Sequence, residues 1–157
     1  MENKNQHFEE IFDKYNKMVY KICFSYLRSH FDSEDILQDS FMDLFYSKKT
    51  FESEEHEKYY LIRIVINNCK THLRKNSKRI LMTDDELSRI KSEENINEVS
   101  IIDIISILPP KYKEIIILKY SENLSYKEIS TILKITEVNA RKRVSRAIKL
   151  LEKEWEE

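Results

Sequence analysis

A predicted helix near the end of the chain carries five side chains that could bind nucleic acid. With Ala140 and Val144 on its inner side, the outward side consists of Arg141, Lys142, Ser145, Arg146 and Lys149. Arginine can form two parallel hydrogen bonds with a guanine edge, and both lysine and arginine neutralise phosphate. The pattern therefore predicts a nucleic-acid surface, with a solvated basic face on a bundle helix as the alternative.

The elements that would position these side chains are a short helix, a turn and a longer helix. Ser125 and Glu128 have the spacing of a capping box, in which two side chains satisfy backbone amides at a helix start, and they open the short helix. The turn is Lys134-Ile135-Thr136, with Lys134 at the left-handed position, Ile135 buried and Thr136 capping the longer helix. This is the pattern of a helix-turn-helix, whose second helix enters a DNA major groove.

A second basic zone lies in the first half of the chain. Residues 58–82 carry seven basic side chains and no acidic one. Apolar residues recur at helical spacing from Tyr60 to Leu73, and Asn68 falls on the inner stripe. The remaining surface of this predicted helix offers cationic, amide and hydroxyl groups from Arg63, Asn67, Lys70, Thr71, Arg74 and Lys75. Such groups can contact phosphates and bases.

Two helices are predicted before this zone. The first runs from Phe8 to about Arg28. The second, over 33–46, is expected to be capped by Asp32 and to present Asp35, Gln38 and Asp39 away from its core stripe. These exposed acidic and amide groups would suit a basic protein surface. Ordinary solvated acids, favoured by the dipole near a helix N-terminus, are the alternative.

The fold class predicted for the whole chain is all-α. The 157 residues include no glycine, and the two prolines are adjacent at 109 and 110, so tight hairpins are disfavoured. Pro109 is expected to stop one helix and Pro110 to start the next. Residues 1–75 and 99–157 are predicted to form two small helical bundles, joined by the polar linker 76–98, which lacks a sustained apolar stripe.

Composition excludes several function classes. Without glycine the chain has no P-loop, GxGxxG turn or GxSxG nucleophile elbow. The four histidines are scattered and Cys23 and Cys69 are isolated, so we expect no catalytic residue, no metal, no cofactor and no enzyme activity. Reduced core thiols are expected, with a disulfide or metal site as the alternative. No apolar run approaches the roughly 20 residues of a membrane helix and no secretory signal is present, so a cytoplasmic protein without membrane insertion is expected.

Motifs in both halves resemble bacterial sigma-70 family factors of the extracytoplasmic-function class. Residues 108–113 (LPPKYK), 124–129 (LSYKEI), 136–137 (TE) and 141–147 (RKRVSRA) are similar to region 4 of that family. Residues 35–41 (DILQDSF) are similar to region 2.2, and 60–68 (YLIRIVINN) with 72–75 (HLRK) to regions 2.3 and 2.4. The resemblance covers roughly residues 8–75 and 100–152 in the family's order.

The resemblance implies a protein that binds core RNA polymerase, directs it to promoter DNA through two elements and helps to open the duplex. It implies core contact by Asp35, Gln38 and Asp39. It implies that the minus-35 element is contacted by Arg141, Lys142, Ser145, Arg146 and Lys149. It implies that the minus-10 element is contacted by Phe51, Arg63, Asn67, Lys70, Thr71, Arg74 and Lys75. The loop Thr50–Glu57 matches the family's loop that captures a flipped base; Phe51 and Tyr59 are stacking partners there or core residues.

Two questions stay open at this point. An anti-sigma factor is a further partner that the family suggests and that the sequence neither requires nor excludes. The alternative function is a helix-turn-helix regulator that binds operator DNA as a dimer, without the polymerase. The acidic helix followed by a basic helix in the first bundle favours the sigma-factor reading, as does the lack of an extra apolar dimer seam.

Overall fold

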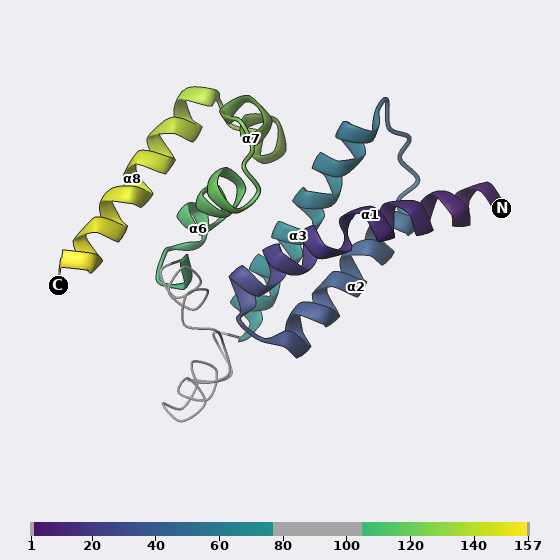
Figure 1. Ribbon diagram of the computed structural model, residues 1–157, viewed down its shortest axis with the longest axis horizontal. Helices are drawn as coiled ribbons and strands as arrows, with labels where there is room; N and C mark the ends of the chain where they lie inside the picture. Colours follow the sequence, from purple (N-terminus) through teal and green to yellow (C-terminus); the bar gives the residue numbers. More distant parts are fainter. Residues whose placement is uncertain (1, 77–104, 157) are drawn as a thin grey trace. The chain divides into compact units, whose positions relative to one another are not determined.

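The computed structural model describes residues 2–76 and 105–156, and every regular element in these ranges is a helix (Figure 1). The elements are α1 (Glu2–Leu27), α2 (His30–Tyr46), α3 (Glu54–Asn76), α6 (Pro110–Ile116), the π-helix η1 (Ile117–Ser121), α7 (Tyr126–Leu133) and α8 (Glu137–Glu156). The predicted all-α class is confirmed for this part of the chain. The predicted linker 76–98 lies outside the described residues, except for Asn76 at the end of α3.

Contacts along the chain divide it into two compact units, Met1–Thr71 and His72–Glu157. The domain limits expected from the sequence, 1–75 and 99–157, stay a prediction. None of the helices in residues 2–76 and 105–156 combines the length and the apolar character that a membrane crossing requires.

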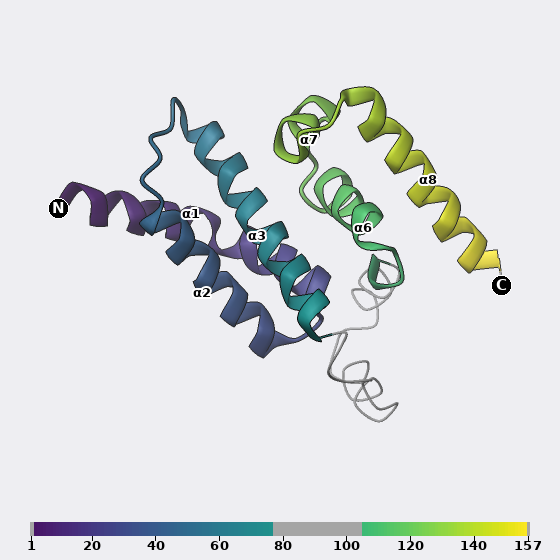
Figure 2. The same cartoon turned by 180° about the vertical axis from the view of Figure 1, so that it is seen from behind.

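The first unit is a three-helix bundle in which α1 packs against α2 and α3 lies beside them (Figures 1 and 2). Its core is apolar and comes from all three helices: Val19, Ile22 and Cys23; Ile36, Leu37 and Phe41; Leu61, Ile62, Val65, Ile66 and Cys69. Both cysteines are free and buried, as predicted. The Phe8 ring meets those of Phe41 and Phe45 edge-on, which extends the α1–α2 contact toward the start of α1.

The start of α2 differs from the sequence prediction. Arg28 has a positive φ of 55°, which ends α1 and leaves Ser29 in an extended conformation. The hydroxyl of Ser29 accepts a hydrogen bond from the Asp32 backbone amide at 3.1 Å, so Ser29 is the N-cap and the helix begins at His30. The predicted cap at Asp32 is therefore wrong, and this carboxylate lies in the first turn, where the helix dipole favours it.

Two helix starts also come earlier than predicted. The first helix begins at Glu2 rather than Phe8, because the polar residues before Phe8 continue the helix without contributing to the core. The third begins at Glu54, where the Ser53 hydroxyl accepts a hydrogen bond from the His56 backbone amide at 3.2 Å. The predicted loop Thr50–Glu57 is thus wrong in its second half, and the irregular segment ends at Ser53.

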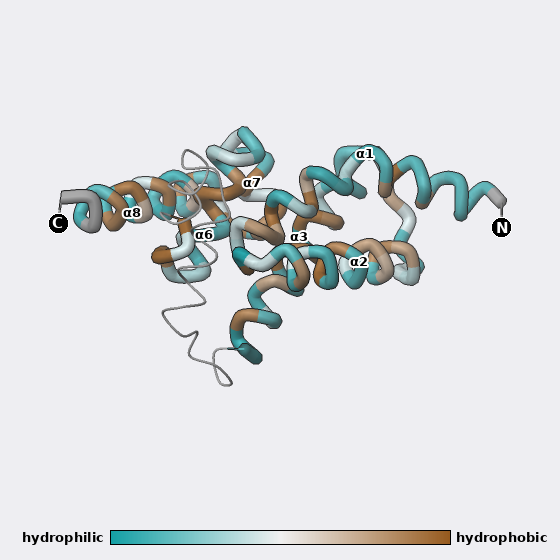
Figure 3. The backbone as a smooth tube through the Cα atoms, turned by 60° about the horizontal axis from the view of Figure 1, so that its bottom comes forward, coloured by the Kyte–Doolittle hydropathy of each residue, from teal (hydrophilic) through white to brown (hydrophobic). Residues whose placement is uncertain are grey.

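In the second unit, α6 and α7 both pack against α8. The core side chains are Ile115, Ile117, Leu118, Ile129, Ile132, Ala140, Val144 and Ala147. Apolar and polar positions alternate along α8 (Figure 3), because only one side of this helix meets its neighbours. Pro109 precedes α6 and Pro110 is its first residue, as predicted.

The helix-turn-helix has the predicted caps. Ser125 and Glu128 form a reciprocal capping box at the start of α7. Lys134 is left-handed (φ 56°, ψ 46°) and ends α7, and the Thr136 hydroxyl accepts a hydrogen bond from the Asn139 amide at 3.0 Å at the start of α8. One detail differs: Ile135 is half-buried rather than buried, because the three-residue turn holds it at the edge of the core.

Candidate nucleic-acid interface

All five predicted contact residues on α8 are exposed. Arg141, Lys142, Ser145, Arg146 and Lys149 lie on the side of the helix away from Ala140, Val144 and Ala147, which are buried. The inner side of α8 packs against its neighbours, and this packing fixes the direction in which the basic side of the helix faces. The structure therefore brings these five side chains together on one face.

A single basic residue in this stretch points inward. The Nη1 atom of Arg143 lies 3.4 Å from Oε1 of Glu114 on α6, and the Glu114 side chain is almost fully buried. This charged hydrogen bond ties α8 to α6 across the unit. The sequence prediction left Arg143 outside the contact set without giving it a role. Its position next to Val144, which lies on the buried stripe, could have indicated an inward contact.

Arg141 has neighbours that the sequence did not indicate. Its guanidinium carbon lies 5.2 Å from the centre of the Tyr126 ring, and Nη2 lies 3.8 Å from Oε2 of Glu137. The Nζ atom of Lys119 lies 4.4 Å from the centre of the same tyrosine ring. Tyr126 and Arg141 also line a shallow groove of about 360 Å³ together with Tyr120 and Lys149. Contacts between α7 and α8 of this kind have no periodic signal in the sequence.

The predicted contact residues of α3 also share one face. Asn67, Arg74 and Lys75 are exposed, and Arg63, Lys70 and Thr71 are half-exposed. Their spacing of three or four residues places them in a row along the helix. Arg74 and Lys75 occupy the last turn, where the helix dipole favours cations.

Asn68 stands apart from this row and has a structural contact, as predicted. Its amide nitrogen donates hydrogen bonds to Oγ of Ser40 at 3.1 Å and to Oδ2 of Asp43 at 3.0 Å, both on α2. The bridge joins α2 to α3 and holds the outward direction of the α3 row.

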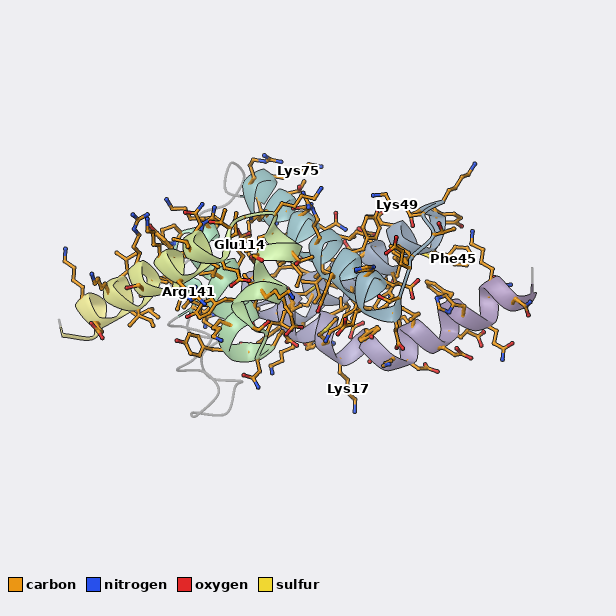
Figure 4. All side chains as sticks on the ribbon, turned by 90° about the horizontal axis from the view of Figure 1, so that it is seen from above. Lys17, Phe45, Lys49, Lys75, Glu114 and Arg141 are labelled. Atoms are coloured by element: carbon orange, nitrogen blue, oxygen red, sulfur yellow. The ribbon has the colours of Figure 1, made fainter. Side chains whose placement is uncertain are left out.

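The irregular segment before α3 adds one aromatic ring to one end of the row. The ring of Phe51 packs against that of Tyr60, with centroids 5.4 Å apart, and Lys49 Nζ lies 4.5 Å from the Tyr60 ring centre. Figure 4 labels Lys49 at this end of α3 and Lys75 at the other. Phe51 and Tyr59 are both half-buried. Each therefore packs against the unit on one side and meets solvent on the other.

A cavity of about 670 Å³ lies beside this segment. Its walls come from Lys4, His7 and Phe8 of α1, from Phe45 of α2, and from Lys49, Phe51 and Ser53. Aromatic rings with nearby cations can hold a flat base and its phosphate. The contribution of α1 to this wall was missed, because the sequence prediction began that helix only at Phe8.

Two polar contacts fasten α1 to the first turns of α3 near the cavity. His7 Nε2 lies 2.9 Å from Oε1 of the buried carboxylate of Glu57, and Lys14 pairs with Glu54. The hydrogen bond from Lys14 lowers the pKa of Glu54 and raises the pKa of Lys14. No sequence pattern indicates these pairs, since their members are 40 and 50 residues apart.

The outward face of α2 contains the predicted acidic set and exposed apolar side chains. Asp35, Gln38 and Asp39 are all exposed. In line with them at helical spacing are Phe31, Met42 and Tyr46, with exposed fractions of 80%, 43% and 68%. Burial, followed by the charges of Asp35 and Asp43, raises the pKa of Asp39. The apolar members were missed, although their spacing from Asp35 and Asp39 was readable.

No three His, Cys, Asp or Glu side chains of residues 2–76 and 105–156 are grouped so that they could hold a metal ion. The contact groups gathered on α3 and α8 are cations, amides, hydroxyls and aromatic rings. Groups of these kinds bind phosphates and base edges in nucleic-acid complexes.

Comparison with protein families assigns both halves of the chain. The family profile described as Sigma-70 region 2 matches residues 11–79, and that described as Sigma-70, region 4 matches residues 98–151. The chain belongs to the sigma-70 family. It is a sigma factor of the extracytoplasmic-function (ECF) class, and its function is promoter-specific initiation of transcription by RNA polymerase.

Named relatives agree with this assignment. The chain is 29% identical over 134 residues to RNA polymerase sigma factor SigV of Bacillus subtilis (strain 168). The aligned segment covers 84% of this chain and 81% of the relative. It is 27% identical over 146 residues to ECF RNA polymerase sigma factor SigM of the same organism, covering 88% and 89%.

Solved structures show the same fold. The sigma factor RpoE from Bartonella quintana, in complex with the anti-sigma factor NepR, matches with a TM-score of 0.73 at 19% identity, over 94% of this chain and 96% of that one. CnrH, in complex with the cytosolic domain of CnrY, matches with a TM-score of 0.72 at 18% identity, over 97% and 89%.

Proposed function

We propose that this sigma factor divides its work among three surfaces. The outward face of α2 binds core RNA polymerase, the α3 row binds the minus-10 element, and the outward face of α8 binds the minus-35 element. The observation that carries the proposal is the exposure of all five contact residues on α8, opposite a buried stripe of Ala140, Val144 and Ala147.

The α2 face combines charge with exposed apolar area. Phe31, Met42 and Tyr46 leave large apolar surfaces in solvent, and a groove of about 520 Å³ between α1 and α2 borders the face at Gln38 and Met42. Asp35 and Asp39 supply negative charge for a basic partner surface. An interface needs an apolar centre and charges that fix its register, and this face offers both.

The α3 row suits DNA whose strands are separating. Arg74 and Lys75 contact phosphates, while Asn67 and Thr71 reach base edges. The cavity beside Phe51 is open to a single unstacked base, with Phe51 as the ring that stacks on it. Capture of such a base stabilises the open duplex, which is the step that follows promoter binding.

The α8 face suits duplex DNA. It is the second helix of a helix-turn-helix, the geometry that enters a major groove. Arg141 and Arg146 read base edges, and Lys142, Ser145 and Lys149 contact the backbone or nearby bases.

The chain performs no catalysis in this scheme and acts in the cytoplasm, where the polymerase and its promoters are. One structural relative above, RpoE, is a sigma factor in complex with an anti-sigma factor, and the other, CnrH, is in complex with a domain of a second protein. We extend this to the present chain: an anti-sigma factor controls it by covering the α2 face.

The test combines binding with transcription. The purified chain is mixed with bacterial core polymerase, and run-off products are sequenced from a promoter library randomised at both elements. The expected result is two enriched elements; Phe31→Ala should weaken binding to core polymerase without loss of helical content, since its side chain is exposed. Binding to duplex DNA without any core-dependent transcription would instead support the polymerase-independent regulator.

A further inference from the structure

Tyr126 is the first residue of α7 and lies against Arg141, a side chain of the outward face of α8. Its ring centre is 5.2 Å from the guanidinium carbon of Arg141 on α8 and 4.4 Å from Nζ of Lys119 on η1. Both distances are within the range in which a cation is attracted to the face of an aromatic ring. One tyrosine therefore holds two cations from two other helices.

The position of the ring is fixed by local hydrogen bonds. The Ser125 hydroxyl accepts from the Glu128 amide at 3.1 Å, and Oε1 of Glu128 accepts from the Ser125 amide at 3.2 Å. These bonds immobilise the turn on which Tyr126 stands. Lys119 is held as well, because its Nζ donates to the carbonyl oxygen of Leu124 at 3.4 Å.

Arg141 is restrained from two sides. Tyr126 lies against the guanidinium, and Glu137, one turn earlier on α8, pairs with Nη2 at 3.8 Å. An arginine on an exposed helix has several rotatable bonds and loses this freedom when it binds a base. A side chain that is already restrained loses less, and therefore binds more selectively for the same contacts.

We propose that Tyr126 is a positioning residue for Arg141, and that its ring sets the orientation in which Arg141 reads a base edge of the minus-35 element. This inference rests on the proposed role of α8 in minus-35 recognition and adds a residue of α7 to it. Tyr126 itself need not touch a base. The guanidinium carbon lies over the aromatic ring, and the hydrogen-bond donors of this planar group project from its edge.

The experiment uses holoenzyme formed with core polymerase and a promoter library with single-base changes in the upstream element. The variants are Tyr126→Leu, Tyr126→Phe, Arg141→Ala and the double variant Tyr126→Leu with Arg141→Ala. Tyr126→Leu should lower discrimination about two- to tenfold, at the same base positions as Arg141→Ala. Tyr126→Phe keeps the ring and should discriminate like the unmodified protein, and the double variant should be no worse than Arg141→Ala alone.

Tyr120→Leu is the matched control, because Tyr120 lines the same groove and is 59% exposed. It should leave the discrimination profile unchanged. The inference is overturned if Tyr126→Leu keeps the normal profile while Arg141→Ala alters it, if its effect is equal at every position, or if Tyr126→Phe fails to restore the profile. An unchanged profile for Arg141→Ala overturns the proposed role of α8 itself, and the inference with it.

Discussion

The basic rows of α3 and α8 differ in what surrounds them. The α3 row adjoins an aromatic pair, Phe51 of the irregular segment and Tyr60 of α3, and a cavity of about 670 Å³. On α8 the row adjoins a shallow groove of about 360 Å³, and its first arginine is already paired with a tyrosine and a glutamate. One helix therefore offers space beside its cations, and the other offers cations held in place.

This difference fits the roles proposed for the two rows, which concern two states of DNA. An unstacked base needs a hollow in which to sit and a ring on which to stack, because it has left its partner and its neighbours. A base pair within a duplex presents a fixed edge, which is best matched by donors whose directions are also fixed. Residue charge alone does not distinguish the two surfaces; the groups next to the charges do.

The largest effect is expected from the arginine that anchors α8. Removing one partner from a buried ion pair costs about 3–5 kcal/mol; since the Arg143 side chain is 28% exposed, we expect Arg143→Ala to destabilise the second unit by about 2–3 kcal/mol. Hydrogen exchange measured by mass spectrometry should show a loss of protection in α6 and α8, and protection in α1, α2 and α3 should be unchanged. Arg141→Ala, two residues away and exposed, should change stability by no more than about 0.5 kcal/mol. Equal effects of the two variants would contradict the anchoring role.

A second change tests whether the first unit has a protein-binding face in addition to the DNA-binding row proposed on α3. Asp35→Lys with Asp39→Lys should weaken core-polymerase binding roughly tenfold and leave helical content intact, because both side chains lie outside the core. The matched control is Glu52→Lys with Glu55→Lys, which makes the same change in charge at exposed positions outside α2. A pull-down in which both double variants bind like the unmodified protein would rule out the α2 face.

The third change compares the two rows directly. Lys75→Ala should lower promoter affinity evenly across sequences and reduce the slope of log K against log salt by about one, as loss of a phosphate contact predicts. Arg141→Ala should instead reduce discrimination among minus-35 sequences by about 1–3 kcal/mol. Salt titrations on matched and mismatched promoters measure both quantities. If the two variants weaken specific and random DNA alike, the division between the rows is wrong.

The smallest effect concerns stability of the free protein. Because burial and the charges of Asp35 and Asp43 raise the pKa of Asp39, the folded state favours its protonated form. Asp39 therefore contributes stability at acid pH that is lost as pH rises above its ordinary value of 3.8. Asp39→Asn removes this loss and should stabilise the protein at pH 7 by less than about 0.5 kcal/mol, seen as a slightly higher Tm. A lower Tm of Asp39→Asn at pH 7 would contradict an unfavourable effect of burial and of the Asp35 and Asp43 charges on the Asp39 carboxylate.

Local rules predicted much of the fold. Ser125 and Glu128 form their capping box because the signal lies within four residues, and Pro109 and Pro110 fix a helix boundary through their own chemistry. The cap of α2 was misplaced because Asp32 and Ser29 are both good caps. The choice depends on where α1 ends, which is decided by the positive φ of Arg28.

The site residues also divide into those that local sequence patterns predict and those that only helix packing brings together. The rows on α3 and α8 follow from helical spacing and could be read in advance, whereas the neighbours of each row could not. Tyr126 meets Arg141 across the turn between consecutive helices, at a spacing that belongs to no helical period, and His7 meets Glu57 through packing between helices far apart in sequence. The apolar members of the α2 face were predictable from spacing, but exposed Phe31 resembles a core residue until the bundle is seen.

Arg28, Asn123 and Lys134 make the left-handed joints of the described chain, all without glycine. A left-handed residue with a Cβ costs about 1–2 kcal/mol, and it holds one backbone geometry where glycine would sample several. The angle between α7 and α8 is consequently set during folding, before any promoter is met. Because this angle is fixed, the DNA duplex must change its own shape to fit the helix-turn-helix. Promoters whose minus-35 segments bend or widen at low energetic cost should then be preferred even at base pairs that no side chain touches.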